Sequence, residues 1–314
     1  MEVFSSGLSV MFYNVENLFL PDDPTSSIKS KSKLYNWNDY RYQNKIHKIS
    51  HVFELVKEET SHLPLLCGLA EVEGKQVLRD LLKNPAMKSY DFVHYDSLDE
   101  RGIDVALLYN KKEVEILHSE PISYFFKIEG NNPNAFDTTR DVLYCKVRVR
   151  EKIFSIFVLH LPSKRERDVN KPKREHIVTE LSDRIAEIMT KEKEAVIVMG
   201  DFNDNPDSNL LQILTQNKNY SENLYNPFLS LYEKGKFSTF HNKFGLVFDQ
   251  IILSQDFFSP SFHIAFKNAN VFTTTKLSSW DRKFRGRPFR TYAGSRYIGG
   301  YSDHYPVMVE FEVK

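Results

Sequence analysis

The sequence has few of the residues on which several classes of protein depend. Only two cysteines, Cys67 and Cys145, occur among 314 residues, which excludes a disulfide scaffold and a cysteine-rich metal site. No uninterrupted apolar run approaches the ~18–20 residues that cross a bilayer, so no membrane span is predicted. The first residues lack the basic stretch and small-residue cleavage site of a secretory signal. A cytoplasmic location is therefore expected, although a chain trimmed at its N-terminus would read the same way.

Net charge is also absent. The 42 Lys and Arg residues balance the 42 Asp and Glu residues, which at first argues against a nucleic-acid-binding protein. Hydrophobic residues make up 41% and aromatic residues 13% of the chain, enough for a large core and too much for a disordered protein. There is no fixed repeat, low-complexity tract or strong linker. We therefore expect a single domain over residues 1–314.

Short apolar runs alternate with amphipathic stretches along the whole chain. Eight runs rich in Val, Ile, Leu, Phe and Tyr are predicted as strands: Ser9–Asn14, Leu65–Ala70, Asp104–Tyr109, Leu143–Val149, Phe154–His160, Ala195–Met199, Leu246–Leu253 and Pro306–Phe311. Apolar residues at steps of three and four predict helices over Ile46–Val56 and Ile177–Ile188, and Pro172 suits the first turn of the second. This pattern predicts a mixed α/β layered fold, with Leu143–Val149 and Phe154–His160 forming a hairpin.

Polar residues mark the ends of six of these runs. They are Asn14-Val15-Glu16-Asn17, Glu71-Val72-Glu73, His160-Leu161-Pro162-Ser163, Asp201-Phe202-Asn203-Asp204, Asp249, and Ser302-Asp303-His304. Carboxylates, amides and imidazoles are costly to bury unless they are paired or bound to a metal. One such residue would be an ordinary solvated turn residue. Because strand ends in layered α/β folds commonly converge on one rim, six together predict a site.

The residue types at these ends suit a particular chemistry. Carboxylate and amide oxygens are ligands for Mg²⁺, Mn²⁺ or Ca²⁺, and the sequence has no thiolate cluster or HExxH motif for zinc. Hard oxygen ligands with two histidines fit the hydrolysis of a phosphate ester. In such a reaction a metal neutralises phosphate charge, a carboxylate or imidazole activates water, and a further cation or imidazole stabilises the pentacovalent state.

The motifs resemble, in kind and in order, those of the endonuclease/exonuclease/phosphatase superfamily. They are FYNVENLF at 12–19, GLAEVE at 68–73, RGIDVALLY at 101–109, TTRD at 138–141, VLHLPS at 158–163, GDFNDNP at 200–206, FDQIILS at 248–254 and SDHYPV at 302–307. The superfamily includes pancreatic deoxyribonuclease, abasic-site endonucleases, inositol polyphosphate 5-phosphatases and neutral sphingomyelinases. The resemblance implies a four-layer α/β sandwich, in which two facing mixed β-sheets are flanked by helices.

The resemblance also implies a set of metal ligands. Glu71 matches the principal metal-ligating glutamate of the family, and Asp303 matches a second metal ligand. Asn14 matches the asparagine that supports the metal and phosphate end of the site, where it is expected to bind substrate. Glu16 stands where some nucleases have a further acid. The implied cofactor is Mg²⁺, and Mn²⁺ or Ca²⁺ would also suit these ligands.

The catalytic roles carry over in the same way. Asp201 and Asn203 match the pair that orients or activates the nucleophile and holds a phosphate oxygen, and alternation in an extended segment would direct Phe202 away from both. His304 matches the histidine that serves as general base or phosphate-binding imidazole. Asp249 matches the acid that orients it. Asp201 and His304 remain rival activators of water.

A second histidine separates branches of the superfamily. His160 matches a histidine of the deoxyribonuclease and phosphatase branches, where abasic-site endonucleases usually have an amide, so a role in abasic-site repair is disfavoured. Arg140 matches an arginine that reaches the substrate phosphate. Asp104 is expected beside the substrate, where it would orient His160. The other eight histidines, His94 among them, are expected to be surface or packing residues.

Two basic segments bear on the substrate. Ser163–Arg174 holds six basic and two acidic residues, and Lys276–Arg296 holds seven basic residues and one acidic residue, interleaved with aromatic residues. Such segments suit a polyanion with groups that stack, or they are solvated loops paired to local acids. The rest of the chain is correspondingly acidic. Neutrality of the whole chain therefore does not exclude a phosphate-rich substrate.

The sequence thus predicts a Mg²⁺-dependent enzyme that hydrolyses phosphodiester bonds, a nuclease acting on nucleic acid. The alternative is a phosphomonoesterase that acts on inositol phosphates or on another small phosphorylated metabolite through the same site. A third hypothesis is a binding protein that kept the fold without catalysis. The sequence implies no obligate protein partner.

Overall fold

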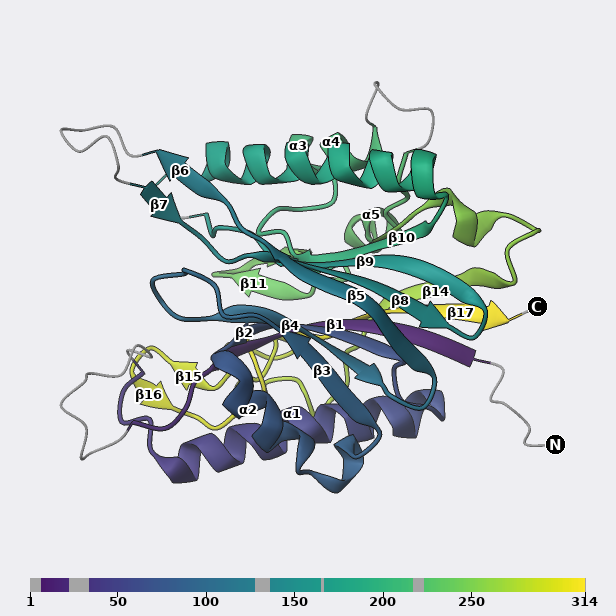
Figure 1. Cartoon of the computed structure of the whole chain (residues 1–314). Coiled ribbons are helices and arrows are strands. Elements are labelled where there is room, and N and C mark those ends of the chain that lie inside the picture. Colours follow the sequence, from purple (N-terminus) through teal and green to yellow (C-terminus); the bar gives the residue numbers. More distant parts are fainter. Residues whose placement is uncertain (1–6, 23–33, 128–135, 165–166, 217–222, 314) are drawn as a thin grey trace.

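The computed structural model describes residues 7–22, 34–127, 136–164, 167–216 and 223–313. Two β-sheets face each other, and helices cover their outer sides (Figure 1). The covering helices are α1 (Asp39–Thr60) and α2 (Gly74–Leu82) on one side, and α3 (Lys171–Glu187) and α4 (Asn209–Thr215) on the other. This arrangement confirms the predicted four-layer α/β sandwich.

The larger sheet has six strands in the order β14-β17-β1-β2-β4-β3. Its strands are β1 (Gly7–Leu18), β2 (Leu66–Val72), β3 (Tyr90–His94), β4 (Asp104–Asn110), β14 (Ile264–Val271) and β17 (Val307–Val313). The second sheet has five strands in the order β13-β10-β9-β8-β5. Its strands are β5 (Val114–Ile122), β8 (Val142–Val149), β9 (Lys152–His160), β10 (Ala195–Asp201) and β13 (Asp249–Leu253).

Shorter elements complete the described part of the chain. Three two-stranded ribbons pair β6 (Phe125–Lys127) with β7 (Phe136–Thr138), β11 (Thr239–His241) with β12 (Phe244–Leu246), and β15 (Tyr292–Ala293) with β16 (Arg296–Tyr297). The remaining helices are α5 (Phe228–Glu233), the 3₁₀ helices Pro85–Met87 and Gln255–Phe258, and the π-helical turn Ile188–Glu192. No helix in the described ranges is long and apolar enough to cross a membrane.

Strand direction brings the polar strand ends to one edge. β1 runs parallel to β2, and β9 runs parallel to β10, so the carboxyl ends of each pair lie together. β17 and β13 run antiparallel to these pairs, so each begins where its neighbour ends. In the second sheet Asp201 is in register with His160 on one side and with Asp249 on the other. The sheet order therefore assembles residues that lie far apart in the sequence.

The two sheets approach closely beneath this edge. Gly68 in β2 lies where an added Cβ would be 2.7 Å from the Sδ of Met199 in β10 and 2.9 Å from a ring carbon of Phe12 in β1. A side chain at position 68 would therefore push the sheets apart. Seven consecutive residues of β10 are buried, and its exclusively apolar first five residues are typical of a central strand covered on both faces.

The predicted elements are confirmed, with one division. All eight predicted strands and both helices are present, and Pro172 lies in the first turn of α3 as expected. The predicted strand Leu246–Leu253 is split, because β12 ends at Leu246 and β13 begins at Asp249. Three further strands, β3, β5 and β14, were not predicted, and all three are edge strands of their sheets. Edge strands expose many residues and so lack a continuous apolar run.

Candidate active site

Asp201 is the centre of the site. Its side chain is buried at the end of β10, and its Oδ1 accepts a hydrogen bond from the backbone N–H of Asn203 at 2.9 Å. Its Oδ2 accepts one from Nδ2 of Asn14 at 3.0 Å. The same Oδ2 lies 3.8 Å from Nε2 of His160 and 3.9 Å from Nε2 of His304. Four of the predicted site residues therefore surround this one carboxylate.

Glu71 reaches the site through an irregularity in β2. The pairing between β2 and β4 shifts register between Ala70 and Val72, and Glu71 has a φ of 66°. A bulge of this kind redirects a side chain, and a positive φ in a non-glycine residue often marks a functional position. Oε1 of Glu71 accepts a hydrogen bond from Nδ2 of Asn14 at 3.3 Å, and Oε2 accepts one from the backbone N–H of Asn17 at 2.9 Å.

Asn14 holds the two carboxylates side by side. Its Nδ2 donates to both Glu71 and Asp201, while its Oδ1 accepts from the backbone N–H of Glu16 at 3.0 Å. Two acid groups thus converge on one amide nitrogen, with Glu71 partly buried and Asp201 buried. This cluster of oxygen donors fits a hard divalent cation, because converging negative charge needs compensation and carboxylate oxygens are its preferred ligands.

His304 is held by Asp249, as the resemblance implied. Nδ1 of His304 lies 2.7 Å from Oδ2 of the fully buried Asp249, and the hydroxyl of Ser238 donates to that same oxygen at 2.6 Å. Asp201, Asp249 and His304 each place one potential ligand atom within 4.8 Å of the others. Ser238 could not be predicted as part of the site, because a lone serine before a short strand carries no signal of its role.

The two histidines have opposite protonation tendencies. Burial alone would lower the pKa of His304, but Asp249, Asp201 and Asp303 raise it well above its usual value. Burial, together with the positive charges of Arg140 and Arg101, lowers the pKa of His160 well below its usual value. At neutral pH His304 therefore carries a positive charge and His160 is neutral. Groups whose pKa values are driven apart in this way are suited to separate acid and base roles.

Asp201 has a pKa suited to exchanging a proton near neutrality. Burial and the neighbouring charge of Asp249 raise it to about 7, against the lowering effects of His304 and of hydrogen bonds from Asn203 and Asn14. A general base works best when its pKa lies near the operating pH. In the metal-free protein Asp201 is thus the better-placed proton acceptor, because His304 is already protonated.

Arg140 is committed to the protein around it. Its Nε donates to the backbone oxygen of His160 at 3.0 Å, and its Nη2 donates to that of Leu161 at 3.1 Å. Its Nη1 pairs with Asp99 at 3.2 Å. The buried guanidinium therefore fixes the end of β9 beside the site, and its predicted contact with substrate phosphate remains a prediction.

Asp104 does not orient His160, contrary to our prediction. Its Oδ1 accepts hydrogen bonds from the backbone N–H and the hydroxyl of Ser97, and its Oδ2 lies 3.4 Å from Nε2 of His94. Nδ1 of His160 is buried without a hydrogen-bond partner. Asp104 is instead engaged by two residues close to it, His94 at the end of β3 in the same sheet and Ser97 in the segment that follows. The predicted role of Asp104 in substrate binding has no support from these contacts.

Asn203 is placed by a turn rather than by strand alternation. The extended segment that we expected ends at Asp201, and Asn203 has a φ of 50°. Its backbone N–H returns to Asp201, and its Nδ2 donates to the backbone oxygen of Leu161 at 2.9 Å. Phe202 is buried in the apolar cluster beneath α3 and α4, so it faces away from the site as predicted.

Asp303 lies at the rim of the site. Its Oδ1 is 3.9 Å from Nε2 of His304, and its Oδ2 accepts a hydrogen bond from Nη2 of Arg290 at 2.7 Å. Its side chain is one-third exposed. Asp303 is therefore close enough to take part in the site, but as a metal ligand it would have to exchange its arginine partner. Its predicted role as a ligand stays a prediction.

A buried ion pair supports the site from below. The ammonium of Lys45 is fully buried, donates to the hydroxyl of Thr291 and to the backbone oxygen of Tyr301, and lies 4.0 Å from Oε2 of Glu16. Burial lowers the pKa of Lys45 to about 8. Burial and the charge of Asp303 raise the pKa of Glu16 to about 7, although Lys45 opposes this. Sequence analysis placed Glu16 near the site but gave no indication of its partner in α1.

We expect Lys45→Met to destabilise the protein more strongly at high pH than at low pH. Removing one partner of a buried ion pair costs about 3–5 kcal/mol, and we expect about 3 kcal/mol at pH 8.5, where Glu16, with no cation beside it, must either stay charged or take up a proton. The pKa of Glu16 is already raised, and without Lys45 it rises further, so below pH 6 the carboxyl is protonated and the loss should fall to about 1 kcal/mol. Urea unfolding at both pH values measures this difference.

The matched control is Lys57→Met, an exposed lysine of the same helix. Its effect should stay within about 0.5 kcal/mol at either pH. An equal loss at both pH values for Lys45→Met would contradict the role assigned to Glu16.

Comparison with known proteins places this geometry in a family. A family model described as "Endonuclease/Exonuclease/phosphatase family" matches residues 9–313. Among solved structures, the endonuclease/exonuclease/phosphatase from Bacteroides vulgatus is 18% identical, with a TM-score of 0.60 and coverage of 99% of this chain and 100% of that chain. No curated protein is significantly similar in sequence.

Two other similar structures have more specific names. A Bacteroides thetaiotaomicron mannosyl-6-phosphatase is 17% identical, with a TM-score of 0.61 and coverage of 97% of this chain and 99% of that chain. D. rerio TDP2, complexed with single strand DNA product, is 16% identical, with a TM-score of 0.57 and coverage of 98% of this chain and 100% of that chain. At these identities the likeness concerns the fold. The family match over nearly the whole chain shows more: the chain belongs to the endonuclease/exonuclease/phosphatase family and is a phosphoesterase of that family.

Proposed function

We propose that this chain is a divalent-metal-dependent phosphodiesterase that cleaves nucleic acid. The catalytic part is supported by the grouping of four side chains around Asp201. Asn14, His160 and His304 lie next to its carboxylate, and Glu71 shares the amide nitrogen of Asn14 with it. The cation would bind at Glu71, with Asp303 as the proposed second ligand; Mg²⁺ is the proposed metal, and Mn²⁺ or Ca²⁺ are alternatives. When bound, it would neutralise negative charge on the substrate phosphate.

The side chains of the site then divide the remaining tasks. Asp201 accepts the proton of the attacking water, since its pKa of about 7 allows proton uptake near neutrality. His304, kept protonated by Asp249, faces the phosphate as a cation and proton donor. In this proposal neutral His160 and the amide of Asn203 hold phosphate oxygens. In this assignment Asp249 acts through His304 and is a positioning residue.

The first basic segment gives little support for nucleic acid as the substrate. Four of its six cations form ion pairs with acids: Lys164 with Asp204, Lys171 with Glu175, Lys173 with Asp137, and Arg174 with Asp168. Arg165 of this segment lies outside the described residues. Most basic residues of this segment are therefore neutralised by nearby acids, as expected for a solvated loop.

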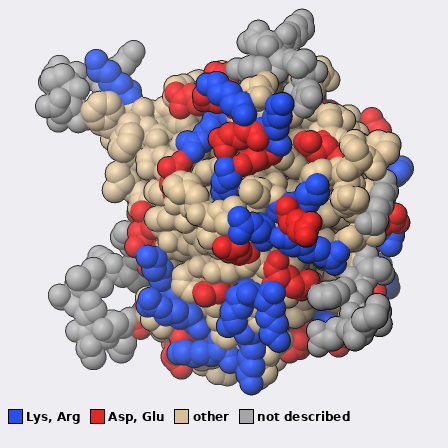
Figure 2. Space-filling view, turned by 45° about the vertical axis from the view of Figure 1, so that its right-hand side comes forward, with Lys and Arg blue, Asp and Glu red and all other residues tan. Residues whose placement is uncertain are grey.

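The second basic segment carries the substrate part of the proposal. A cavity of about 940 Å³ is lined by Arg282, Arg285, Lys236 and the 83% exposed Trp280, and by Tyr305, which follows His304 in the chain. Cationic side chains beside exposed aromatic rings suit a strand of nucleic acid, whose phosphates and bases they can contact. The surface charge is uneven, with basic side chains gathered over the lower part of one face (Figure 2).

A phosphomonoesterase is the second candidate, acting on inositol phosphates or on another small phosphorylated metabolite. The catalytic centre would serve either reaction, and a mannosyl-6-phosphatase and a DNA-bound TDP2 are similar to this fold to nearly the same degree. A non-catalytic binding protein is disfavoured by the complete set of carboxylates and histidines. We also propose that residues 1–314 form one domain, because the main apolar cluster takes residues from both sheets.

A panel of substrates tests the proposed function. We expect plasmid nicking and turnover of bis-p-nitrophenyl phosphate with Mg²⁺, and loss of both with EDTA. Release of inorganic phosphate from inositol phosphates should be at least tenfold slower than diester turnover. Metal-dependent phosphate release without diester cleavage would overturn the nuclease proposal in favour of the phosphomonoesterase.

The double substitution Arg282→Ala/Arg285→Ala tests the cavity. We expect the KM for single-stranded DNA to rise about tenfold and the slope of log affinity against log salt to fall by about 1.5, because two phosphate contacts are lost. Turnover of bis-p-nitrophenyl phosphate, which is too small to reach the cavity, should be unchanged. The control Lys171→Ala/Lys191→Ala removes two paired surface cations. An equal rise in KM for the control would remove the support for this cavity as the DNA-binding surface.

A further inference from the structure

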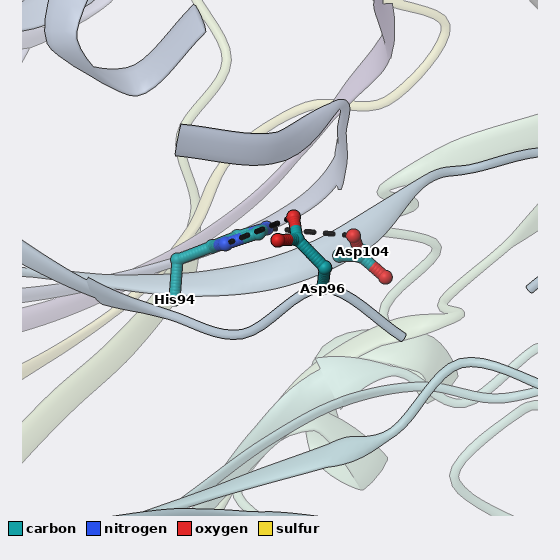
Figure 3. Close-up of side chains that lie close together, drawn as sticks. All are labelled: His94, Asp96 and Asp104. Carbon is teal, nitrogen blue, oxygen red and sulfur yellow. Dashed lines mark ion pairs between the residues drawn. The ribbon is translucent and has the colours of Figure 1, made fainter. Parts of the chain in front are cut away.

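A second cluster of titratable side chains lies beside the sheet that carries Glu71. His94 ends β3, Asp104 begins β4, and Asp96 lies in the segment between them. Nε2 of His94 is 3.4 Å from Oδ2 of Asp104, and Nδ1 of His94 is 3.9 Å from Oδ1 of Asp96. Both carboxylates lie beside the imidazole, and each forms an ion pair with one of its ring nitrogens (Figure 3).

The buried imidazole of His94 has no hydrogen bond. Its side chain is fully buried, and neither ring nitrogen has a hydrogen-bond partner. A buried polar group without a partner is destabilising, and in native proteins it often marks a position that binds an ion or a water or that has a function. We had expected His94 to be a surface or packing residue. A packing histidine would be expected to make at least one hydrogen bond to its surroundings.

We propose that His94, Asp96 and Asp104 form a second divalent-cation site, suited to Zn²⁺ or Mn²⁺. One potential ligand atom from each residue lies within 4.8 Å of the others. With tetrahedral bonds of about 2.0–2.2 Å, two ligands of one metal lie about 3.3–3.6 Å apart, which matches the 3.4 Å between His94 and Asp104. One imidazole with two carboxylates is a mixed set that favours these cations over Mg²⁺.

The surroundings prepare Asp104 and Asp96 for this role. Ser97 donates to Oδ1 of Asp104 through its hydroxyl and its backbone N–H, which leaves Oδ2 directed at the imidazole. A carboxylate held in this way keeps its orientation before a cation binds. The side chain of Asp96 is 75% exposed, so it can move onto the metal at little cost, and a cation can enter from this side.

The second site would stabilise a segment that contacts the catalytic centre. The residues between Asp96 and Asp104 include Asp99, which pairs with Arg140, and Arg101, which donates to Oδ1 of Asn17 at 2.6 Å. Asn17 in turn donates its backbone N–H to Glu71. A cation that joins the two ends of this segment restricts its motion. The second cation therefore has a structural role, distinct from that of a metal at Glu71.

Metal stoichiometry tests the inference without any measurement of activity. Metal-free protein is titrated with Co²⁺, a spectroscopic substitute for Zn²⁺, while visible absorption and heat are recorded. We expect two equivalents for the wild-type protein and one for His94→Gln. We expect at least tenfold weaker binding at the second site for Asp96→Asn, whose exposed side chain can change without unfolding the protein. The exposed His118→Gln is the matched control and should keep two equivalents.

Glu71→Gln separates this inference from the proposed function. This variant should lose the Co²⁺ equivalent at the catalytic centre and keep the equivalent at His94. The Co²⁺ bound at His94 should show the intense visible absorption of a low-symmetry site with one nitrogen and two oxygen ligands. The inference is overturned if His94→Gln and Asp96→Asn bind as much Co²⁺ as the wild-type protein with the same affinity. It would also fail if Glu71→Gln bound no Co²⁺, because every equivalent would then belong to the catalytic centre.

Discussion

Asp201→Asn is expected to lower kcat/KM for bis-p-nitrophenyl phosphate by at least about 10³-fold, because general base catalysis alone contributes about 10²–10⁴-fold. The substitution removes the carboxylate on which Asn14 and both histidines converge. Asparagine keeps the size of the side chain and can still accept the hydrogen bond from Asn203. The loss should therefore be in kcat, with the unfolding temperature within a few degrees of the wild-type value.

The control for this variant is Asp207→Asn, an exposed acid that follows the same GDFNDNP motif. It should retain full activity. Near-wild-type kcat/KM in Asp201→Asn would exclude Asp201 as the activator of water and would return that role to His304. Measuring both variants at saturating Mg²⁺ ensures that a weakened metal site is not mistaken for a lost base.

His304→Ala is expected to lower kcat/KM by about 10³-fold, because it removes a preorganised positive charge from the phosphate site. The more informative variant is Asp249→Asn. Asp249 is the main cause that raises the pKa of His304 against the effect of burial. If the protonated imidazole is the active form, wild-type activity falls as pH rises through that raised pKa. Asp249→Asn lowers the pKa, so the alkaline limb of the pH profile should move at least one pH unit lower.

Ser238→Ala is the control for geometry without charge. It removes the hydroxyl that donates to Oδ2 of Asp249 and accepts from the backbone N–H of Asp249, and it leaves the carboxylate in place. The alkaline limb of this variant should shift by less than half a pH unit. If His304 were instead the base, Asp249→Asn would move the acid limb of the profile and leave the alkaline limb in place. The direction of the shift therefore decides between the rival roles of His304.

Much of the fold could be predicted from the sequence, because the signals of its central strands and helices lie within short segments. Central strands such as β10 are buried on both faces and show continuous apolar runs, while α1 and α3 show helical spacing of apolar residues. Edge strands could not be predicted in this way. β5 contains Pro121 and alternates irregularly between buried and exposed residues, so its identity as a strand depends on its pairing with β8.

The candidate site, like the fold, could be predicted only where local sequence carries the information. The sequence by itself determined which residue types end which strands, and the order of its motifs indicated the family, because both are properties of short segments. Only the tertiary structure decided the partners that no motif implied: Ser238 for Asp249, and Lys45 for Glu16.

The structure also decided which polar residues stand apart from the catalytic centre. Asp104 faces His94 in a cluster of its own. Arg140, which we expect to reach the substrate phosphate, lies beside the site and donates to the backbone oxygens of His160 and Leu161. The bulge at Glu71 is likewise absent from any local pattern. The physical reason is that burial, charge state and hydrogen bonding depend on neighbours far away in the chain. Those neighbours are fixed by the order and register of strands in two facing sheets.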